Sequence, residues 1–253
     1  MRRILIYVAY DGTDYHGWQL QDNVKTIESE LNAAINAITG EDIQVIGASR
    51  TDAGVHARGN RAVFDTSSAI PAENWPMALN SQLPEDIRVV SARETEPYWH
   101  PRKCATLKTY EYVLDCGRIA DPIGARFAWH VPYKLDVDKM NEAAKVLLGE
   151  HDFTSFCSVK GTALSNVRTI TDISVIKEES RVIQDNDRVV ISVTGNGFLY
   201  NMVRIITGTL VEAGRGKKTA ADIKEILDNK DRRRGAMTAP PQGLVLARIV
   251  DME

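Results

Sequence analysis

Cysteine is scarce in this sequence, and long hydrophobic runs are missing from it. The three cysteines, Cys104, Cys116 and Cys157, are widely spaced and form no CxxC pair. An odd number at such spacing argues against a disulfide framework or a structural zinc site and is typical of a reducing cytoplasm. Because no apolar run is long enough for a membrane span or for the core of a signal peptide, we expect a cytoplasmic protein without membrane segments.

Motifs that bind cofactors are also missing. The sequence has no dinucleotide fingerprint, no P-loop and no cluster of residues with metal-ligand spacing. The sequence therefore carries no motif that indicates a nucleotide cofactor or a metal.

An excess of positive charge is missing as well. The 31 Lys and Arg are outnumbered by 34 Asp and Glu, and the net charge of −3 weighs against nucleic acid as a partner. Local patches nevertheless decide whether a phosphate backbone can be held. Basic residues gather in four stretches: Arg50, Arg58 and Arg61; Arg102, Lys103 and Lys108; Arg215, Lys217 and Lys218; and Arg232, Arg233 and Arg234. Solvated surface charge is the alternative interpretation of each stretch.

The hydrophobic pattern predicts an α+β fold with two similar halves. The chain is 43% hydrophobic and 26% charged, which is the balance of a globular protein. In the first half, the pattern predicts strands at 2–10, 43–49, 60–66 and 86–94. It also predicts one helix that follows the N-cap Thr26 and ends at Gly40, and a second helix from Pro71 to about Leu83. The second half predicts strands at 107–115, 166–178, 188–194 and 244–250, and helices at 137–148, 199–213 and 220–229.

This order predicts two ferredoxin-like halves of the βαββαβ type, with antiparallel sheets side by side and an active-site cleft between them. The expected domains are 1–104 and 105–253.

Three segments carry candidate chemistry. The first, RTDAGVHA at 50–57, falls between two expected strands and is therefore a loop. Asp-Ala-Gly is an ordinary turn sequence. However, an aspartate flanked by Arg50 and His56, with Gly54 allowing close backbone approach, also suits a carboxylate presented to a ligand.

The second segment is GNGFLYNMVRIITGTLV at 195–211, in which Arg204 is the only charge. Gly197, Asn201, Arg204 and Gly208 share one face of the expected helix, with small residues where another backbone can approach. A buried guanidinium needs a carboxylate or phosphate partner, and the alternative is an arginine that reaches solvent.

The third segment is LKTYEYVLD at 107–115. Tyr110 and Tyr112 point to the same face of the expected strand, with Lys108 beside them. Aromatic residues at this period usually belong to a core, but they also form stacking surfaces for RNA bases.

Longer motifs extend from one end of the chain to the other, namely YDGTDYHGWQLQ, SRTDAGVHARGN, LPEDI, KTYEYV, GEHDFTSF, VRTI, GNGFLYNMVR and APPQGL. With these motifs the chain resembles the tRNA pseudouridine synthase A family. The resemblance implies an isomerase that needs no cofactor and acts at positions 38, 39 and 40 in the anticodon stem-loop of tRNA. It also implies a homodimer.

The resemblance also implies roles for single residues. Asp52 matches the essential aspartate, Tyr110 the tyrosine that packs on the target base, and Arg204 the basic residue paired with the aspartate. Arg50 matches the arginine that helps to hold the target nucleotide out of its stack. We expect further RNA contacts from Arg58, Lys103 and Lys108.

The chain departs from the family pattern at three positions. Pro101 stands where a small residue is common, Lys103 where an aromatic is common, and Asn60 where Gln is usual. These differences bear on substrate contacts around 58–61 and 100–104 and remove no proposed catalytic group. We interpret His16 and His56 as scaffold or RNA-adjacent residues, and Trp18, Gln19 and Gln21 as either RNA contacts or packing residues.

Two other function classes fit parts of the pattern. One is a non-catalytic RNA-binding or chaperone module on the same fold, which would have no need of Asp52 and Arg204 together. The other is a small-molecule enzyme on a ferredoxin-like scaffold, against which a strongly salt-dependent affinity for tRNA would count.

Overall fold

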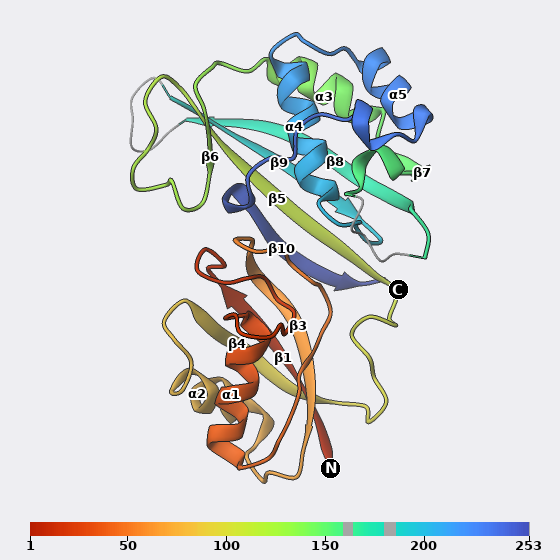
Figure 1. Ribbon diagram of the computed structural model, residues 1–253. Coiled ribbons are helices and arrows are strands. Elements are labelled where there is room, and N and C mark those ends of the chain that lie inside the picture. Colours follow the sequence, from red (N-terminus) through yellow and green to blue (C-terminus); the bar gives the residue numbers. More distant parts are fainter. Residues whose placement is uncertain (159–163, 180–185, 253) are drawn as a thin grey trace. The chain divides into compact units, whose positions relative to one another are not determined.

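The chain has a mixed α+β fold made of two compact units (Figure 1). The computed structural model describes residues 1–158, 164–179 and 186–252. The N-terminal unit holds Met1–Thr106 together with the segment from Val245 onward, and the C-terminal unit holds Leu107–Leu244. The expected domain of residues 105–253 differs from this division at its C-terminal end. The last strand, β10 (Leu244–Asp251), pairs in parallel with a strand of the N-terminal unit.

The sheet of the N-terminal unit is built around β1 (Arg2–Tyr10). Both neighbours of β1, β3 (His56–Thr66) and β4 (Ile87–Thr95), pair with it antiparallel, and β10 lies along β3 in the order β4-β1-β3-β10. The short β2 (Ile46–Gly47) also pairs antiparallel with β3. The pairing of β1 with β3 shifts between Val8 and Tyr10, so the chain bends where the YDG segment leaves the sheet.

Helices α1 (Ile27–Thr39) and α2 (Trp75–Asn80) complete this unit. The side chains of Thr26 and Ser29 form a capping box at the start of α1, and Gly40 ends it in the left-handed conformation, as the sequence predicts. The unit's core consists of fully buried apolar side chains from β1, α1, β3 and α2, among them Ile4, Ile6, Leu31, Ile35, Phe64 and Trp75.

In the C-terminal unit, four strands pair antiparallel in the order β5-β9-β8-β7. These strands are β5 (Thr106–Cys116), β7 (Gly149–Asp152), β8 (Val167–Glu179) and β9 (Asp187–Gly195). A short strand, β6 (Trp129–Val131), runs parallel to the end of β5.

Three helices pack against one another in this unit (Figure 1): α3 (Val137–Lys145), α4 (Met202–Gly214) and α5 (Ala220–Asn229). Helix α3 contacts β8, α4 and α5. Helix α4 is buried along almost its whole length, and only Arg204 and Glu212 are half-buried. Short 3-10 turns lie at Ala72–Asn74, Thr154–Phe156, Arg232–Arg234 and Pro241–Gly243.

Several element boundaries differ from those expected. The helix expected at 199–213 begins at Met202, because Asn201 adopts the left-handed conformation with φ 62°. Strand β3 begins at His56 instead of 60, so His56 is a strand residue and not a loop residue. The strand expected at 43–49 shortens to Ile46–Gly47, and the helix expected from Pro71 shortens to Trp75–Asn80.

Among the residues that the structure describes, no helix is long and apolar enough to cross a membrane, and no group of His, Cys, Asp or Glu side chains could hold a metal ion.

Candidate active-site residues

Asp52 lies in a tight turn between β2 and β3. The Val55 amide donates a hydrogen bond to the Asp52 carbonyl oxygen at 3.1 Å, and Gly54 adopts φ 76° to complete the turn. Asp52 is half-buried, whereas its neighbour Thr51 is buried. The turn that the sequence predicts is therefore present, and it presents a partly exposed carboxylate on a fixed backbone.

The segment from Tyr10 to Trp18 packs directly against this turn. The Trp18 amide donates to the Thr51 carbonyl oxygen at 3.1 Å. Two glycines permit this approach. A Cβ at Gly12 would lie 2.0 Å from the Val55 carbonyl oxygen, and one at Gly17 would lie 2.7 Å from the Thr51 carbonyl oxygen. The YDGTDYHG motif thus acts as a brace for the RTDAGVHA loop, since no larger residue fits at these two positions.

Asn60 fastens the other end of the loop. This side chain is fully buried, accepts a hydrogen bond from the Ser49 amide at 3.2 Å and donates one to the Ser49 carbonyl oxygen at 2.8 Å. The departure from the family pattern at this position therefore falls on an inward-facing scaffold residue.

The two histidines near the loop have different surroundings. His56 is 4% exposed, and its Nδ1 atom accepts a hydrogen bond from the Gly12 amide at 3.0 Å and lies 3.1 Å from Asp11 Oδ1. His16 is exposed. His56, the first residue of β3, thus links this strand to the brace, which is the geometry of a scaffold histidine.

Of the residues that follow His16, Trp18 is a packing residue. It is buried, and its indole lies directly over Gly47. Gln19 and Gln21 are exposed, and Gln21 donates to the His16 carbonyl oxygen at 2.9 Å.

The arginines near the loop divide into exposed and buried ones. Arg50 and Arg58 are exposed, as residues that contact RNA must be. Arg61 is 6% exposed and donates to Asp251 Oδ1 at 2.6 Å and to the Ile249 carbonyl oxygen at 2.8 Å. Arg61 therefore holds β10 in place and does not belong to a basic surface.

Lys103 and Arg102 lie exposed in the segment before β5. Burial lowers the pKa of the neighbouring His100, and the positive charges of Arg102 and Lys103 lower it further. The segment thus carries a locally positive field, which suits a phosphate contact.

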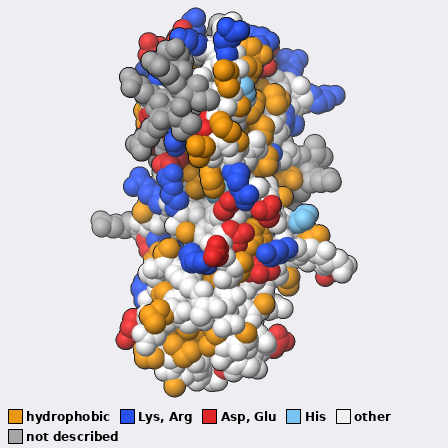
Figure 2. Space-filling view, turned by 90° about the vertical axis from the view of Figure 1, so that its left-hand side faces the viewer, with side chains coloured by type: hydrophobic (Ala, Val, Ile, Leu, Met, Phe, Trp, Pro, Cys, Tyr) orange, Lys and Arg blue, Asp and Glu red, His pale blue; other side chains and the backbone are white. Residues whose placement is uncertain are grey.

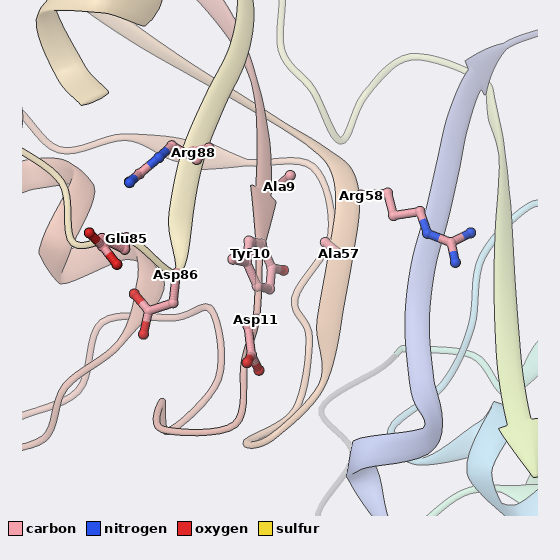
Figure 3. Close-up of a pocket in the computed structure, with 8 residues that line it drawn as sticks. All are labelled: Ala9, Tyr10, Asp11, Ala57, Arg58, Glu85, Asp86 and Arg88. Carbon is pink, nitrogen blue, oxygen red and sulfur yellow. The ribbon is translucent and has the colours of Figure 1, made fainter. Parts of the chain in front are cut away.

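A shallow depression of about 480 Å³ lies beside the brace on the N-terminal unit (Figure 3). Three carboxylates line it, from Asp11, Glu85 and Asp86, and the Arg58 side chain points away from them. Arg88 also lines the depression, and its guanidinium donates to the Pro84 and Ile87 carbonyl oxygens. Because the carboxylates outnumber this arginine and would repel phosphate, the depression is a poor site for an RNA backbone.

Tyr110 lies on β5 of the C-terminal unit, opposite Val193 of β9. It is 6% exposed, and its ring meets that of Phe198 edge to face, with centroids 5.2 Å apart. Lys108 is half-buried on the same strand. Phe198 fixes the tilt of the Tyr110 ring. It belongs to the GNGFLYNMVR motif, but the sequence pattern alone does not predict this contact.

Arg204 is held at the first turn of α4. Its Nε atom donates to the Ala239 carbonyl oxygen at 2.7 Å, and its guanidinium donates to Asn201 Oδ1 at 2.8 Å. The Ala239 amide donates back to the Arg204 carbonyl oxygen at 3.1 Å. Arg204 is half-buried, as the apolar surroundings predict, and these contacts fix its orientation.

Tyr112 of β5 contacts the same segment as Arg204. The phenol is fully buried and donates to the Pro240 carbonyl oxygen at 2.7 Å, next to the residue that Arg204 contacts. Burial raises the pKa of Tyr112, and the Arg204 guanidinium acts in the opposite direction. Tyr112 is therefore a core residue, and Tyr110 is the tyrosine of the pair that remains a candidate for stacking on a base.

The last two basic stretches are partly used within the protein. Arg233 forms a paired contact with Asp231, Arg234 contacts Glu225, and Lys218 lies 3.4 Å from Glu212. Figure 2 shows Lys and Arg side chains scattered among hydrophobic ones over the upper part of the face in view, and beside Asp and Glu across its middle. These two stretches are thus weaker candidates for RNA contact than Arg50, Arg58 and Lys103.

The structure places the proposed catalytic residues on different units. Asp52 belongs to the N-terminal unit, and Tyr110 and Arg204 belong to the C-terminal unit. The expected ion pair between Asp52 and Arg204 stays a prediction.

Comparison with known proteins identifies the family. A family model described as tRNA pseudouridine synthase matches residues 6–102 and 143–250. The chain is 48% identical over 250 residues to tRNA pseudouridine synthase A of Brevibacillus brevis, covering 99% of this chain and all of the relative. It is 45% identical over 250 residues to the protein of that name from a Thermoanaerobacter species, with the same coverage. It is also 45% identical over 249 residues to that of Halalkalibacterium halodurans, covering 98% of this chain and 92% of the relative. By the family model and by these full-length relatives, the chain belongs to the tRNA pseudouridine synthase family, the isomerases that convert uridine to pseudouridine in tRNA.

Proposed function

We propose that this chain makes pseudouridine at positions 38, 39 and 40 in the anticodon stem-loop of tRNA, with Asp52 as the essential catalytic carboxylate. The observation that carries the proposal is the RTDAGVHA loop, in which a braced backbone holds the Asp52 carboxylate half-exposed. The full-length relatives named tRNA pseudouridine synthase A support the same activity.

The reaction explains why one carboxylate suffices. The bond between N1 of uracil and C1′ of ribose breaks, the base turns, and a bond between C5 and C1′ forms. The C5 proton leaves, and N1 gains a proton. Nothing is oxidised and no water is consumed, so the enzyme has to supply a nucleophile or base and hold the freed base in place.

Asp52 has to be ionised, whether it attacks C1′, attacks C6 or removes a proton in a glycal route. An arginine close by favours the ionised form, since an opposite charge lowers the pKa of a carboxyl by about one to three units. Arg204 is the group we assign to this role. Its bonds to Ala239 and Asn201 would keep it oriented throughout the reaction.

Tyr110 is assigned to stack on the uracil ring. Its edge-to-face contact with Phe198 supports a fixed ring plane, which a stacking partner needs. The target uridine cannot be reached within a helix, so it must be extruded, and Arg50 is assigned to hold it out. Arg58, Lys103 and Lys108 are assigned to the RNA backbone.

The architecture we propose is a pair of ferredoxin-like halves. In the N-terminal unit the antiparallel order β4-β1-β3-β2, with α1 and α2 as the connecting helices, supports this topology. We further propose that the N-terminal domain carries the aspartate loop and the C-terminal domain the tyrosine and the arginine. In addition, we propose a homodimer that acts on tRNA in the cytoplasm.

Asp52→Asn tests the catalytic assignment. The amide has nearly the same shape but can act neither as a nucleophile nor as a base. We therefore expect pseudouridine formation to fall at least about a hundredfold, while tRNA binding persists. The substrates are tRNA transcripts in which only one of positions 38, 39 and 40 is a uridine. Chemical labelling of pseudouridine in these transcripts measures both the activity and the target position.

Asp42→Asn is the matched control, because Asp42 is an exposed carboxylate on the same unit. We expect it to leave the rate unchanged. Full product formation by Asp52→Asn would show that the catalytic assignment is wrong. Binding without turnover by the unaltered protein would instead favour the non-catalytic RNA-binding module.

A further inference from the structure

A chain of buried polar side chains lies beneath the loop that carries Asp52. The Tyr10 hydroxyl lies 2.8 Å from Thr51 Oγ1 and 3.5 Å from Asn60 Nδ2. The three residues are 5%, 7% and 0% exposed. Thr51 directly precedes Asp52, and Asn60 holds both backbone groups of Ser49. The Tyr10 hydroxyl therefore lies between the two groups that fix the loop upstream of Asp52.

The Asn60 side-chain amide fixes the direction of its hydrogen bond with Tyr10. Its Oδ1 atom accepts from the Ser49 and Arg61 amides, so its Nδ2 atom, which can only donate, faces Tyr10. The Tyr10 oxygen accepts this long contact, and the Tyr10 and Thr51 hydroxyl groups share a hydrogen bond in which either can be the donor. Each member of the chain then has a partner, as buried polar groups require.

We propose that Tyr10 is a positioning residue for catalysis, acting on Asp52 through the Thr51 hydroxyl. This inference rests on the proposed role of Asp52. Without the Tyr10 hydroxyl, Thr51 Oγ1 loses a buried hydrogen bond, and the backbone that carries Asp52 can relax toward other partners. Because a shift of about 1 Å in a reacting group can cost two orders of magnitude in rate, a small relaxation is sufficient.

The effect is separable from packing. The Tyr10 ring contacts the Trp18 ring, with centroids 6.0 Å apart, and phenylalanine would keep this contact. Tyr10→Phe thus removes the hydroxyl alone. Tyr15 offers a matched control, since it is a 2% exposed tyrosine on the same unit whose hydroxyl donates to Asp86 Oδ1 at 2.6 Å.

The experiment compares Tyr10→Phe with Tyr15→Phe. For Tyr10→Phe we expect kcat to fall about tenfold while KM for tRNA stays within about twofold. For Tyr15→Phe we expect both constants to stay within about twofold. Hydrogen exchange supplies a readout besides activity. Amides of a peptide covering residues 49–54 should exchange faster in Tyr10→Phe than in Tyr15→Phe.

Substitutions at Thr51 test the route of the effect. Thr51→Val removes the hydroxyl at nearly constant shape, and Thr51→Ser keeps it. We expect Thr51→Val to lower kcat as Tyr10→Phe does, Thr51→Ser to restore most of the rate, and the double variant Tyr10→Phe/Thr51→Val to be no slower than either single variant. Such non-additivity is what one shared hydrogen bond produces.

An unchanged kcat in Tyr10→Phe, or strictly additive effects in the double variant, would overturn the inference. An equal loss of kcat in Tyr15→Phe would also overturn it, by showing a general loss of stability. Asp52→Asn, assayed alongside, separates this failure from that of the proposed function. An inactive Asp52→Asn with a fully active Tyr10→Phe contradicts the positioning role alone, whereas an active Asp52→Asn contradicts both.

Discussion

Single residues on the sheet of the N-terminal unit make its stability depend on pH. Arg3 and Asp65 lie opposite each other on β1 and β3, and the Arg3 guanidinium donates two hydrogen bonds to the Asp65 carboxylate at 2.8 Å and 2.6 Å. These bonds hold the pKa of Asp65 below its ordinary value. Because the Asp65 side chain is 40% exposed, solvent weakens the interaction without removing it.

The lowered pKa of Asp65 determines how stability changes with pH. A carboxyl whose pKa is lower in the folded chain than in the unfolded chain stabilises the fold above the unfolded value of about 3.9. The contribution disappears as the pH falls through the lower, folded value. We expect Asp65→Asn to reduce the difference between the urea midpoints at about pH 7 and about pH 3. Asp42→Asn should leave this difference unchanged, and an equal difference in both variants would contradict the assignment.

Sequence motifs single out candidate catalytic residues, but they do not predict which side chains hold those residues in place. Asp52, Tyr110 and Arg204 stand in long motifs that can be compared with a family. Asn60 and Thr51 act through backbone atoms and a hydroxyl that become neighbours only after β1 and β3 have paired. A polar residue within a run of strand residues, as Asn60 is, indicates a special role for its side chain. The sequence does not show which groups that side chain contacts.

At the level of elements, the packing of α4 depends on one glycine. A Cβ at Gly208 would lie 2.1 Å from the Met237 carbonyl oxygen, so the segment that ends in Ala239 passes directly over the helix. The same segment supplies the carbonyl group that Arg204 contacts. The small face that the sequence predicts on this helix is therefore the place where another backbone approaches.

Gly208→Ala tests this packing. Since backbone has to move away from the new methyl group, we expect the free energy of unfolding to fall by about 1 to 3 kcal/mol, measured by urea unfolding. Gly59→Ala is the control, because nothing lies within 4 Å of the position that its Cβ would take. A Gly208→Ala variant as stable as Gly59→Ala would show that the segment does not press on the helix.

The start of α4 illustrates why boundaries are harder to predict than elements. The apolar periodicity continues through Leu199, so the expected helix began there. In the structure Asn201 takes the left-handed conformation, and its side chain accepts from Arg204 and donates to Ser158 Oγ at 2.9 Å. The contact with Ser158 joins residues far apart in the sequence, and no local pattern predicts it.

For the whole molecule, we expect a dimer. The family resemblance implies this state for the chain of 28.1 kDa, since the anticodon arm and the rest of a tRNA would span more surface than one expected cleft offers. Light scattering should give twice this mass, and the rate per chain should fall on dilution as the dimer dissociates. A monomer that stays fully active on tRNA would contradict the prediction.

The division of the chain into units also shows a limit of sequence patterns. Periodicity predicts strand 244–250 but not the unit to which it belongs, because the choice depends on which strand edge is left open. In the structure this strand, β10, pairs with β3, where Val245 lies opposite His56 and Leu246 opposite Ala57.

That parallel pairing has a consequence for the order of folding during synthesis. The ribosome finishes the loop of Asp52 early, yet β10, the strand beside His56, is translated only after the whole C-terminal unit. At about 5 to 20 residues per second, this delay is on the order of ten seconds. During that time the edge of β3 lacks β10, so the unit that carries Asp52 begins to form before the C-terminal unit and is completed after it.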